Sequence, residues 1–266
     1  YIQRPVVPGI ECVGVIEDPS DSRFSKGDRV IAMMGGMGRS FDGSYAEYAA
    51  LPAHHVFRVD TDLPWDELAA IPETYLTAWG SLFECLRLKR GESLLIRGAT
   101  CALVYAAIEM AKALGCMVIA TTHRESKLAL LEKADVSVLD NGHLQGKVES
   151  DKALDLVGPK SLLDTLRCVR RGGIVCDTGI LGGVYALDGF DPIKDIPNGV
   201  YLTGYFSNCP TQESVDGIFR FIREHGLHPS YAMRFDFGDI REACIALDEG
   251  RANGKIVVVI DQEGRR

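Results

Sequence analysis

The sequence predicts an α/β protein that has a doubly wound parallel sheet at its centre and a smaller, mostly β domain. Between Glu92 and Lys127 the residues follow the pattern strand, tight turn, helix and strand, which is typical of a right-handed βαβ unit. After Lys127, short apolar runs continue to alternate with helical patterns, as in parallel sheets that carry helices on both faces. Before position 60, several short apolar runs are separated by Gly, Pro and Asp, which indicates a small barrel-like domain.

The central βαβ unit has the clearest pattern. Ser93–Arg97 is an apolar run that is too short for a helix and is bounded by glycines. Ala102–Leu114 has apolar residues at a helical period, and Gly115 follows it in the role of a C′ glycine. Cys116–Thr121 is a second apolar, β-branched run. The turn between the first strand and the helix is the place where such sheets bind nucleotides.

The remaining elements follow from the same patterns. Near the start, strands are expected within Val6–Glu17, Ser25–Ala32 and His55–Val59, and Asp42–Leu51 shows aromatic-apolar alternation after a turn. A long amphipathic helix is expected at Thr74–Leu88. The later strands are expected at Ser137–Leu139, Lys152–Leu156, Gly173–Thr178, Val200–Tyr205, Met233–Phe237 and Lys255–Asp261, and the later helices at Ser126–Lys133, Lys160–Val169, Thr211–His225 and Gly238–Glu249.

Composition and charge narrow the classes of function. Of the 266 residues, 46% are hydrophobic and 25% are charged, and the net charge is −8. This acidic balance argues against nucleic acid as the main partner. No apolar run approaches the roughly 18 residues that a membrane span needs, so no membrane partner is expected. The eight cysteines include no CxxC pair, and several lie in apolar segments, so reduced thiols in a cytoplasmic protein are expected.

Seven motifs occur in order along the chain. They are PGIECVGVIED, KGDRVIA, GSYAEYAALPA, IPETYLTAWGSL, LKRGESLLIRGAT, LRCVRRGGIVCDTGILGG and GRANGKIVVVI. The ordered set resembles the medium-chain dehydrogenase/reductase superfamily, in its zinc-independent, quinone oxidoreductase-like branch. The resemblance implies a discontinuous GroES-like catalytic domain at residues 1–75 and 228–266, and a Rossmann dinucleotide-binding domain at residues 76–227.

Two segments are shorter than the family's pattern. The upstream segment that carries an asparagine and a tyrosine lining the substrate cleft has no match, so the GroES-like domain is expected to be N-terminally incomplete. Residues 132–155 also lack part of the family's pattern. Because a truncated barrel would leave strand edges exposed, missing residues are favoured over a genuinely reduced fold.

The sequence gives no indication of a metal site. Zinc-dependent members of the superfamily carry Gly-His-Glu in the segment that matches Pro8–Gly14, and this chain has Ile10 at the position of the histidine. A catalytic zinc needs three N, S or O donors, and isoleucine supplies none. The four closely spaced cysteines of a structural zinc lobe are also missing from the sequence.

The resemblance implies that the turn after the first Rossmann strand binds the cofactor's pyrophosphate. The family pattern there is Gly-Ala-x-Gly-Gly-Val-Gly, and only its first glycine is kept. The corresponding residues are Gly98, Ala99, Thr100, Cys101, Ala102, Leu103 and Val104. The helix N-terminus still offers free N–H groups and a positive dipole end. A Rossmann-like domain that binds dinucleotide weakly or not at all remains the alternative.

The end of the second Rossmann strand favours NADP(H) over NAD(H). Val118–Thr122 contains no acid that could accept hydrogen bonds from the ribose hydroxyls. Hydroxyl and cationic side chains gather there instead, a combination that suits a 2′-phosphate. They are Thr121, Thr122, His123, Arg124 and Lys127, of which Lys127 matches a lysine of NADP-dependent members. A solvated basic loop is the alternative for Arg124 taken alone.

The resemblance also implies contacts with the nicotinamide end of the cofactor. The corresponding residues are Thr77, Gly179, Ile180, Leu181, Tyr205, Phe206, Asn253 and Lys255. Core packing is an equally open interpretation for the two aromatic residues. Tyr45 is a candidate proton donor by residue type only, and a structural aromatic on a strand is the alternative.

Together these features imply an NADPH-dependent, zinc-independent oxidoreductase that reduces quinones or α,β-unsaturated carbonyls by direct hydride transfer. A homodimer is implied by the family, with Val200–Phe206 as the edge that continues the sheet across a two-fold axis. The alternative is a non-catalytic member with a degraded nucleotide loop that binds a ligand or a protein partner.

Overall fold

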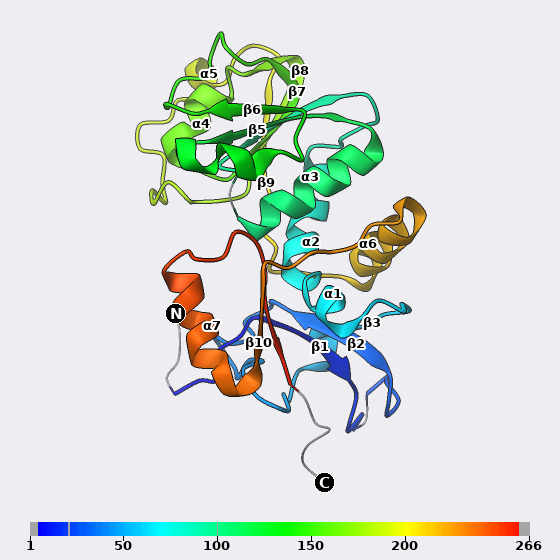
Figure 1. The fold of residues 1–266 in the computed structure, drawn as a ribbon. Coiled ribbons are helices and arrows are strands. Elements are labelled where there is room, and N and C mark those ends of the chain that lie inside the picture. The colour runs from blue at the N-terminus through cyan, green and yellow to red at the C-terminus, as the bar shows by residue number, and fades with distance from the viewer. Residues whose placement is uncertain (1–4, 21, 100, 261–266) are drawn as a thin grey trace. The chain divides into compact units, whose positions relative to one another are not determined.

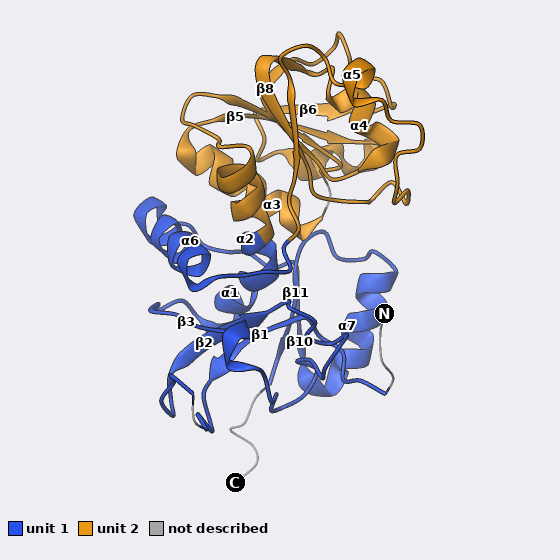
Figure 2. Cartoon of the chain, turned by 180° about the vertical axis from the view of Figure 1, so that it is seen from behind, with its two compact units in different colours: residues 1–76, 207–266 blue, residues 77–206 orange. Residues whose placement is uncertain are grey.

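The computed structural model describes residues 5–20, 22–99 and 101–260. The chain divides into two compact units, shown in different colours in Figure 2. Unit 1 comprises residues 1–76 and 207–266, and unit 2 comprises residues 77–206. These units differ from the sequence-based domain limits mainly in residues 207–227, which group with unit 1.

Unit 2 is built on a six-stranded sheet with the order β6-β5-β4-β7-β8-β9, in which all neighbouring strands are parallel (Figure 1). This order reverses between β4 and β7, as in the Rossmann fold, so the predicted fold class is confirmed. The strands are β4 (Ser93–Arg97), β5 (Met117–Thr122), β6 (Val136–Leu139), β7 (Ser150–Asp155), β8 (Val169–Asp177) and β9 (Tyr201–Gly204).

Helix α3 (Ala102–Leu114) follows β4 with the bounds that the sequence predicts. It ends at Gly115, whose φ of +86° is the left-handed conformation expected of a C′ glycine. The other helical segments between the strands of this sheet are short. They are η3 (Glu125–Leu131, a 3₁₀-helix), α4 (Pro159–Thr165) and α5 (Pro192–Asp195).

The segment predicted as one long helix is divided into two helical forms. Helix α2 (Pro72–Trp79) continues as a π-helix, η2 (Gly80–Cys85). At Gly80 an added Cβ would lie 1.9 Å from Cζ of Tyr205, so only glycine lets the aromatic ring lie against the backbone there. Amphipathic periodicity cannot distinguish an α-helix from a π-helical turn, which is why the sequence did not predict the change.

Unit 1 contains a three-stranded antiparallel sheet with the order β1-β2-β3 and a parallel pair, β10 and β11. Its strands are β1 (Glu11–Val15), β2 (Arg29–Met33), β3 (Val56–Arg58), β10 (Met233–Asp236) and β11 (Ile256–Val259). Its helical segments are η1 (Ala53–His55), α1 (Trp65–Ala69), α6 (Gln212–His225), η4 (Phe237–Asp239) and α7 (Ile240–Asp248).

The alternating segment Asp42–Leu51 forms no strand. Its backbone bonds instead to the chain before β1: Gly43 N donates to Val7 O at 2.8 Å, and Tyr45 N donates to Pro8 O at 3.0 Å. The alternation of aromatic and small residues therefore belongs to a largely exposed loop rather than to a sheet.

Each unit has a core of its own. In unit 2, Leu95, Ile119 and Val175 of the sheet pack with Leu162 and Leu166 of the α4 region. In unit 1, residues of β2, β3 and the connecting loops form a second cluster, Phe24, Val30, Ala32, Met37 and Val56. Of the helices in the described ranges, none is at once long enough and apolar enough to cross a bilayer.

Candidate functional site

The turn between β4 and α3 contains a single glycine, Gly98. Gly98 has φ +89°, and an added Cβ would lie 3.0 Å from Cγ2 of Val157, so a side chain would be strained by the backbone conformation and tightly packed. Ala99 is fully buried, and its N–H donates to Thr121 O at 2.7 Å. This bond ties the turn to the end of β5. Thr100 lies outside the described residues.

Helix α3 begins after Cys101, whose side chain does not cap the helix. Ala102 and Leu103 are half-buried in the first turn. Val104, which stands where the family has its last glycine, is fully buried, and its N–H donates to Cys101 O at 3.0 Å. The valine side chain is therefore accommodated in the core. A helix N-terminus without a side-chain cap suits an anionic group such as a pyrophosphate.

The hydroxyl residues Thr121 and Thr122 end β5, and the cationic residues follow it in the next loop. Thr121 and Thr122 are buried, and the Thr122 Oγ1 accepts the Arg124 N–H at 3.3 Å. The Nε of Arg124 lies 3.2 Å from Nε2 of His123, and both side chains are exposed. Lys127 is half-buried, and its N–H donates to Arg124 O at 2.9 Å. The Thr121 Oγ1 is buried without a hydrogen-bond partner in the described part of the chain.

A buried arginine, which the sequence did not suggest, lies at the end of β4. Arg97 is 1% exposed and forms a bidentate pair with Asp140, at 2.7 Å from Nε to Oδ2 and 3.1 Å from Nη2 to Oδ1. Its Nη1 donates to Asp164 Oδ2 at 2.7 Å and to Thr165 Oγ1 at 3.0 Å. Burial alone would lower the pKa of Arg97, but the two carboxylates outweigh it and raise that pKa.

The two partners of Arg97 fix the loop that follows β6. Asp140 N donates to Thr122 O at 2.8 Å, and Asp140 Oδ1 accepts Gly142 N at 2.8 Å. Asp164 Oδ2 accepts Leu144 N at 2.8 Å. Although burial opposes it, the N–H groups of Leu144 and Gln145 and the charge of Arg97 lower the pKa of Asp164. The loop is thus held between the end of β5, where the 2′-phosphate is predicted, and α4.

Two further carboxylates end the neighbouring strands β7 and β8. Asp155 is fully buried and accepts hydrogen bonds from the N–H groups of Val157 and Gly158 and from two side-chain hydroxyls. Asp177 pairs with Asp155 in the sheet register, and its Oδ1 is buried without a partner among the described residues. Burial, with the charge of Asp155, raises the pKa of Asp177 to about 6, and the N–H of Gly179 offsets this in part.

The loop after β8 contains the residues predicted to contact the carboxamide. At Gly179 an added Cβ would lie 2.5 Å from Leu156 O, so glycine is required by close backbone approach. Leu181 N donates to Leu156 O at 2.9 Å, so this N–H is already used within unit 2. The side chains of Ile180 and Leu181 are 44% and 60% exposed.

A hydroxyl chain connects this loop to the helical segment before β4. Ser81 Oγ donates to Thr77 O at 2.7 Å and lies 3.0 Å from Thr178 Oγ1. Thr77 is buried at 5% exposure. Tyr205 packs against Gly80, whereas Phe206 is 76% exposed. Within unit 2 the structure therefore brings Thr77 close to the end of β8 through Ser81.

In unit 1, Lys255 is held by an ion pair. Its Nζ bonds to the carboxylate of Glu11 and lies 3.2 Å from Thr74 Oγ1, while Glu11 Oε2 accepts Glu73 N at 2.9 Å. Asn253 is exposed. The lysine predicted to contact cofactor thus has a partner within its own unit.

Tyr45, the candidate proton donor, is 40% exposed in unit 1. Burial, the charge of Cys244 and a hydrogen bond with that thiol raise the pKa of Tyr45. A phenol with a raised pKa holds its proton more tightly, which makes it a weaker acid.

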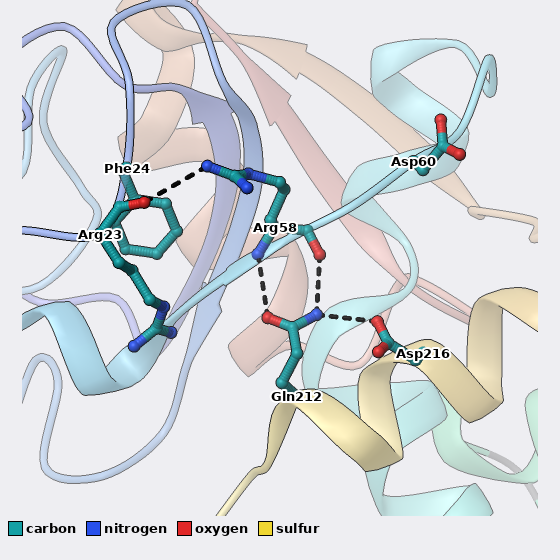
Figure 3. Close-up of a pocket in the computed structure, with 6 residues that line it drawn as sticks. All are labelled: Arg23, Phe24, Arg58, Asp60, Gln212 and Asp216. Atoms are coloured by element: carbon teal, nitrogen blue, oxygen red, sulfur yellow. Dashed lines mark hydrogen bonds between the residues drawn. The ribbon is translucent and has the colours of Figure 1, made fainter.

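Unit 1 also has a surface depression of about 390 Å³, shown in Figure 3. It is lined by Arg23, Phe24, Arg58, Asp60, Gln212 and Asp216. The amide of Gln212 bonds to both the N–H and the carbonyl of Arg58, at 3.2 and 2.9 Å, and so fixes α6 on β3. Arg58 is itself paired with Asp28. None of the predicted site residues lines this depression, and the charge of Arg58 is neutralised by Asp28.

No group of three or more His, Cys, Asp or Glu side chains within the described ranges is arranged to hold a metal ion.

Two family models match the chain. Residues 1–61 match the alcohol dehydrogenase GroES-like domain, and residues 132–258 match a domain described as zinc-binding dehydrogenase. Human quinone oxidoreductase is 31% identical over 192 residues, which cover 68% of this chain and 57% of that protein. A zinc-type alcohol dehydrogenase-like protein of Schizosaccharomyces pombe is 25% identical over 301 residues, which cover 98% of this chain and 84% of that protein.

Solved structures show the same fold. The yhfP protein of Bacillus subtilis with NAD bound has a TM-score of 0.84 at 24% identity, covering 96% of this chain and 82% of that one. The E. coli YhdH protein with bound NADPH has a TM-score of 0.81 at 21% identity, with the same coverage of 96% and 82%.

Proposed function

Because the chain belongs to the medium-chain dehydrogenase/reductase superfamily, we propose that it is a zinc-independent oxidoreductase that reduces quinones or α,β-unsaturated carbonyls with NADPH. The observation that supports the cofactor is the carboxyl edge of the unit 2 sheet. There the Gly98 turn, an α3 N-terminus without a side-chain cap and the cluster from Thr121 to Lys127 follow adjacent strands. Open α/β sheets bind dinucleotides at this edge.

The residues present fit a dinucleotide at three places in unit 2. The N-terminus of α3 would hold the pyrophosphate, which needs N–H donors and a close backbone approach. Arg124, Lys127 and the hydroxyl of Thr121 would hold the 2′-phosphate, and the orphaned Thr121 Oγ1 has capacity for such a ligand. The loop at Gly179 would hold the carboxamide. The bound nicotinamide supplies the hydride, so the chain's own groups bind, orient and exclude water.

The proposed reaction needs no metal. Ile10 precedes Glu11, and Glu11 is engaged with Lys255 and with the backbone of Glu73, so its carboxylate is already occupied. Relatives include a protein named as zinc-type, so the assignment to the zinc-independent branch is part of the proposal. Metal analysis of the purified protein tests it, and stoichiometric zinc that supports activity would contradict it.

We further propose that the protein is cytoplasmic and forms a homodimer through β9. This strand is at the edge of the sheet, and Tyr201 on it is 62% exposed. An unpaired edge strand can continue a sheet into a second copy. Sedimentation equilibrium tests the dimer, and a monomer at micromolar concentration would contradict it.

A second candidate function is that of a non-catalytic binding protein. The observation that favours it is the turn itself, where Cys101 and Val104 replace glycines of the family pattern. Titration with NADPH and with NADH, followed by cofactor fluorescence, separates the two functions. Saturable NADPH binding supports the reductase, and an absence of binding at millimolar cofactor supports the second candidate.

The preference for NADPH has a specific test. Replacing Lys127→Ala together with Arg124→Ala should raise the NADPH dissociation constant by about tenfold or more for each charge-assisted contact that is lost, because each such contact contributes roughly 1.4 kcal/mol or more. NADH binding should change little. The control pair Lys26→Ala and Arg220→Ala removes two exposed cations of unit 1 and should leave both constants unchanged. Equal losses for NADPH and NADH would contradict a phosphate role.

A further inference from the structure

Two cysteines of unit 2 lie against each other beside the Gly179 loop. Cys176 is fully buried on β8, and its Sγ lies 3.3 Å from Thr178 Oγ1. Cys85 is the last residue of the π-helix η2, and its Sγ donates to Gly204 O at 3.5 Å. Gly204 lies on β9, one residue after the register partner of Cys176. Ser81, four residues before Cys85 on η2, lies 3.0 Å from the same Thr178 hydroxyl, so η2 brings the Cys85 thiol to the neighbourhood of Cys176.

The two thiols differ in access. Cys85 is half-buried, so a small solute in water can reach it, whereas Cys176 is enclosed. Their arrangement matches a reactive thiol with a resolving thiol behind it. Burial is the main cause that raises the pKa of Cys176 to about 12, and the neighbouring Cys85 adds to it. The hydrogen bond with Thr178 acts in the opposite direction and lowers this pKa. When Cys85 is oxidised to a neutral sulfenic acid, its charge no longer contributes to the rise in the pKa of Cys176.

We propose that Cys85 and Cys176 are a redox modification site, which forms a reversible disulfide when the protein meets a peroxide. The Cys85 thiolate attacks one peroxide oxygen, the O–O bond breaks, and the released hydroxide takes a proton to become water. The Cys176 thiolate then attacks the Cys85 sulfur, the S–O bond breaks, and a second water leaves. The two thiols lose two electrons and two protons, and hydrogen peroxide is reduced to two waters. A dithiol restores both thiols by exchange.

The bridge acts on the predicted carboxamide loop, and this part rests on the proposed function. The Cys176 Sγ now lies 3.3 Å from Thr178 Oγ1, which in turn lies 3.0 Å from Ser81 Oγ. A disulfide of about 2.05 Å is much shorter than a thiol contact, so η2 and β8 must approach. Because η2 contains Ser81 and β8 leads into Gly179, the bridge shifts both sides of this hydroxyl chain. The oxidised protein should bind NADPH about tenfold more weakly. This change in affinity corresponds to a loss of roughly 1.4 kcal/mol of binding free energy.

The bridge is tested by mass spectrometry on the full chain. Protein is treated with hydrogen peroxide, remaining thiols are blocked with iodoacetamide, and the digest is analysed without reductant. We expect a linked peptide pair containing Cys85 and Cys176 that disappears with dithiothreitol. Cys85→Ser should abolish the pair, and Cys209→Ser, which removes an exposed thiol, should not affect it. The absence of the linked pair under conditions that oxidise Cys209 would overturn the proposal.

The regulatory effect is measured separately by NADPH titration. Peroxide should weaken NADPH binding to the wild-type protein, dithiothreitol should restore it, and Cys176→Ala should show no such change. A linked pair that leaves NADPH affinity unaltered would overturn the regulatory part. If reduced wild-type protein binds no NADPH, the proposed function fails, whereas the linked pair still decides the modification site.

Discussion

The carboxyl edge of the unit 2 sheet contains two buried charge clusters that are built in opposite ways. At the end of β4, one cation is shared by the carboxylates of Asp140 and Asp164, and every charged group has a partner. At the ends of β7 and β8, Asp155 and Asp177 lie side by side in the register without a cation between them. The first cluster is compensated by opposite charge, whereas the second has only hydrogen-bond donors, several on Asp155 and the single Gly179 N–H on Asp177, whose Oδ1 has no partner among the described residues.

Because of this difference in charge compensation, the first cluster has a structural role, whereas the second can respond to pH. Removing one partner from a compensated cluster leaves buried charges unpaired, so the cluster fixes the loop after β6. An uncompensated carboxylate is held at a cost that protonation relieves, so it makes the site sensitive to pH. Thr165 joins the two clusters, because its Oγ1 accepts Arg97 Nη1 at 3.0 Å and donates to Asp155 Oδ2 at 2.5 Å.

Removing the cation from the compensated cluster should give the largest loss of stability. Arg97→Met keeps much of the side-chain volume but leaves Asp140 and Asp164 without their cation, which should lower the free energy of unfolding by about 3–5 kcal/mol. The measurement is urea denaturation at neutral pH. Arg170→Met is a matched control, because Arg170 pairs with Asp151 at the surface with 53% of its side chain exposed, and should cost no more than about 1 kcal/mol. Equal losses for the two variants would contradict the role of burial.

Cutting the link between the clusters should have a smaller effect. Thr165→Val retains the shape of a fully buried side chain but removes one donor to the Asp155 carboxylate. Hydrogen bonds to charged groups contribute up to about 3 kcal/mol, so a loss of about 2 kcal/mol is expected in the same denaturation experiment. Thr61→Val removes a single bond of 3.3 Å, from Leu63 N, in a half-buried loop and serves as the control. A loss no greater than that of the control would show that Asp155 does not depend on this donor.

Neither cluster could be predicted from the sequence, although the sheet that holds them could. The strands of the sheet are local apolar runs, so periodicity and glycines located Ser93–Arg97 and Ala102–Leu114 with the observed bounds. The partners of Arg97 come from a loop and a helix 43 and 67 positions away, and no local pattern connects them. Arg97 within an otherwise apolar run was the available signal, since a charge in a buried strand requires partners.

In the candidate site, too, groups that are contiguous in sequence could be predicted, whereas contacts between distant residues could not. The cluster from Thr121 to Lys127 is contiguous in sequence, and the structure keeps it together at the end of β5. The ion pair of Lys255 with Glu11 joins the two ends of the chain, 244 positions apart, and only the fold brings them together. The proximity of half-buried Cys85 to buried Cys176 was missed because their spacing resembles no cysteine motif.

The smallest expected change in the free energy of unfolding is that of the uncompensated carboxylate, Asp177. Its pKa is raised in the folded protein to about 6, from 3.8, so ionisation of Asp177 is less favourable in the folded than in the unfolded state. The resulting destabilisation is absent below pH 3.8, develops between pH 3.8 and 6, and is complete above pH 6. Asp177→Asn keeps an oxygen that can accept the Gly179 N–H and removes the charge. It should therefore raise the free energy of unfolding at pH 7 by about 1 kcal/mol, after discounting for partial exposure.

The pH dependence distinguishes this effect from ordinary repacking. The gain from Asp177→Asn over the wild type should shrink as the pH falls from 7 to 4, because the wild-type carboxyl then becomes neutral as well. Asp188→Asn, which removes an exposed carboxylate of the same unit, should give no comparable trend. A gain that is constant from pH 4 to 7 would mean that the asparagine acts through packing. A trend limited to Asp177 would establish that the end of β8, unlike the end of β4, holds a charge without compensation.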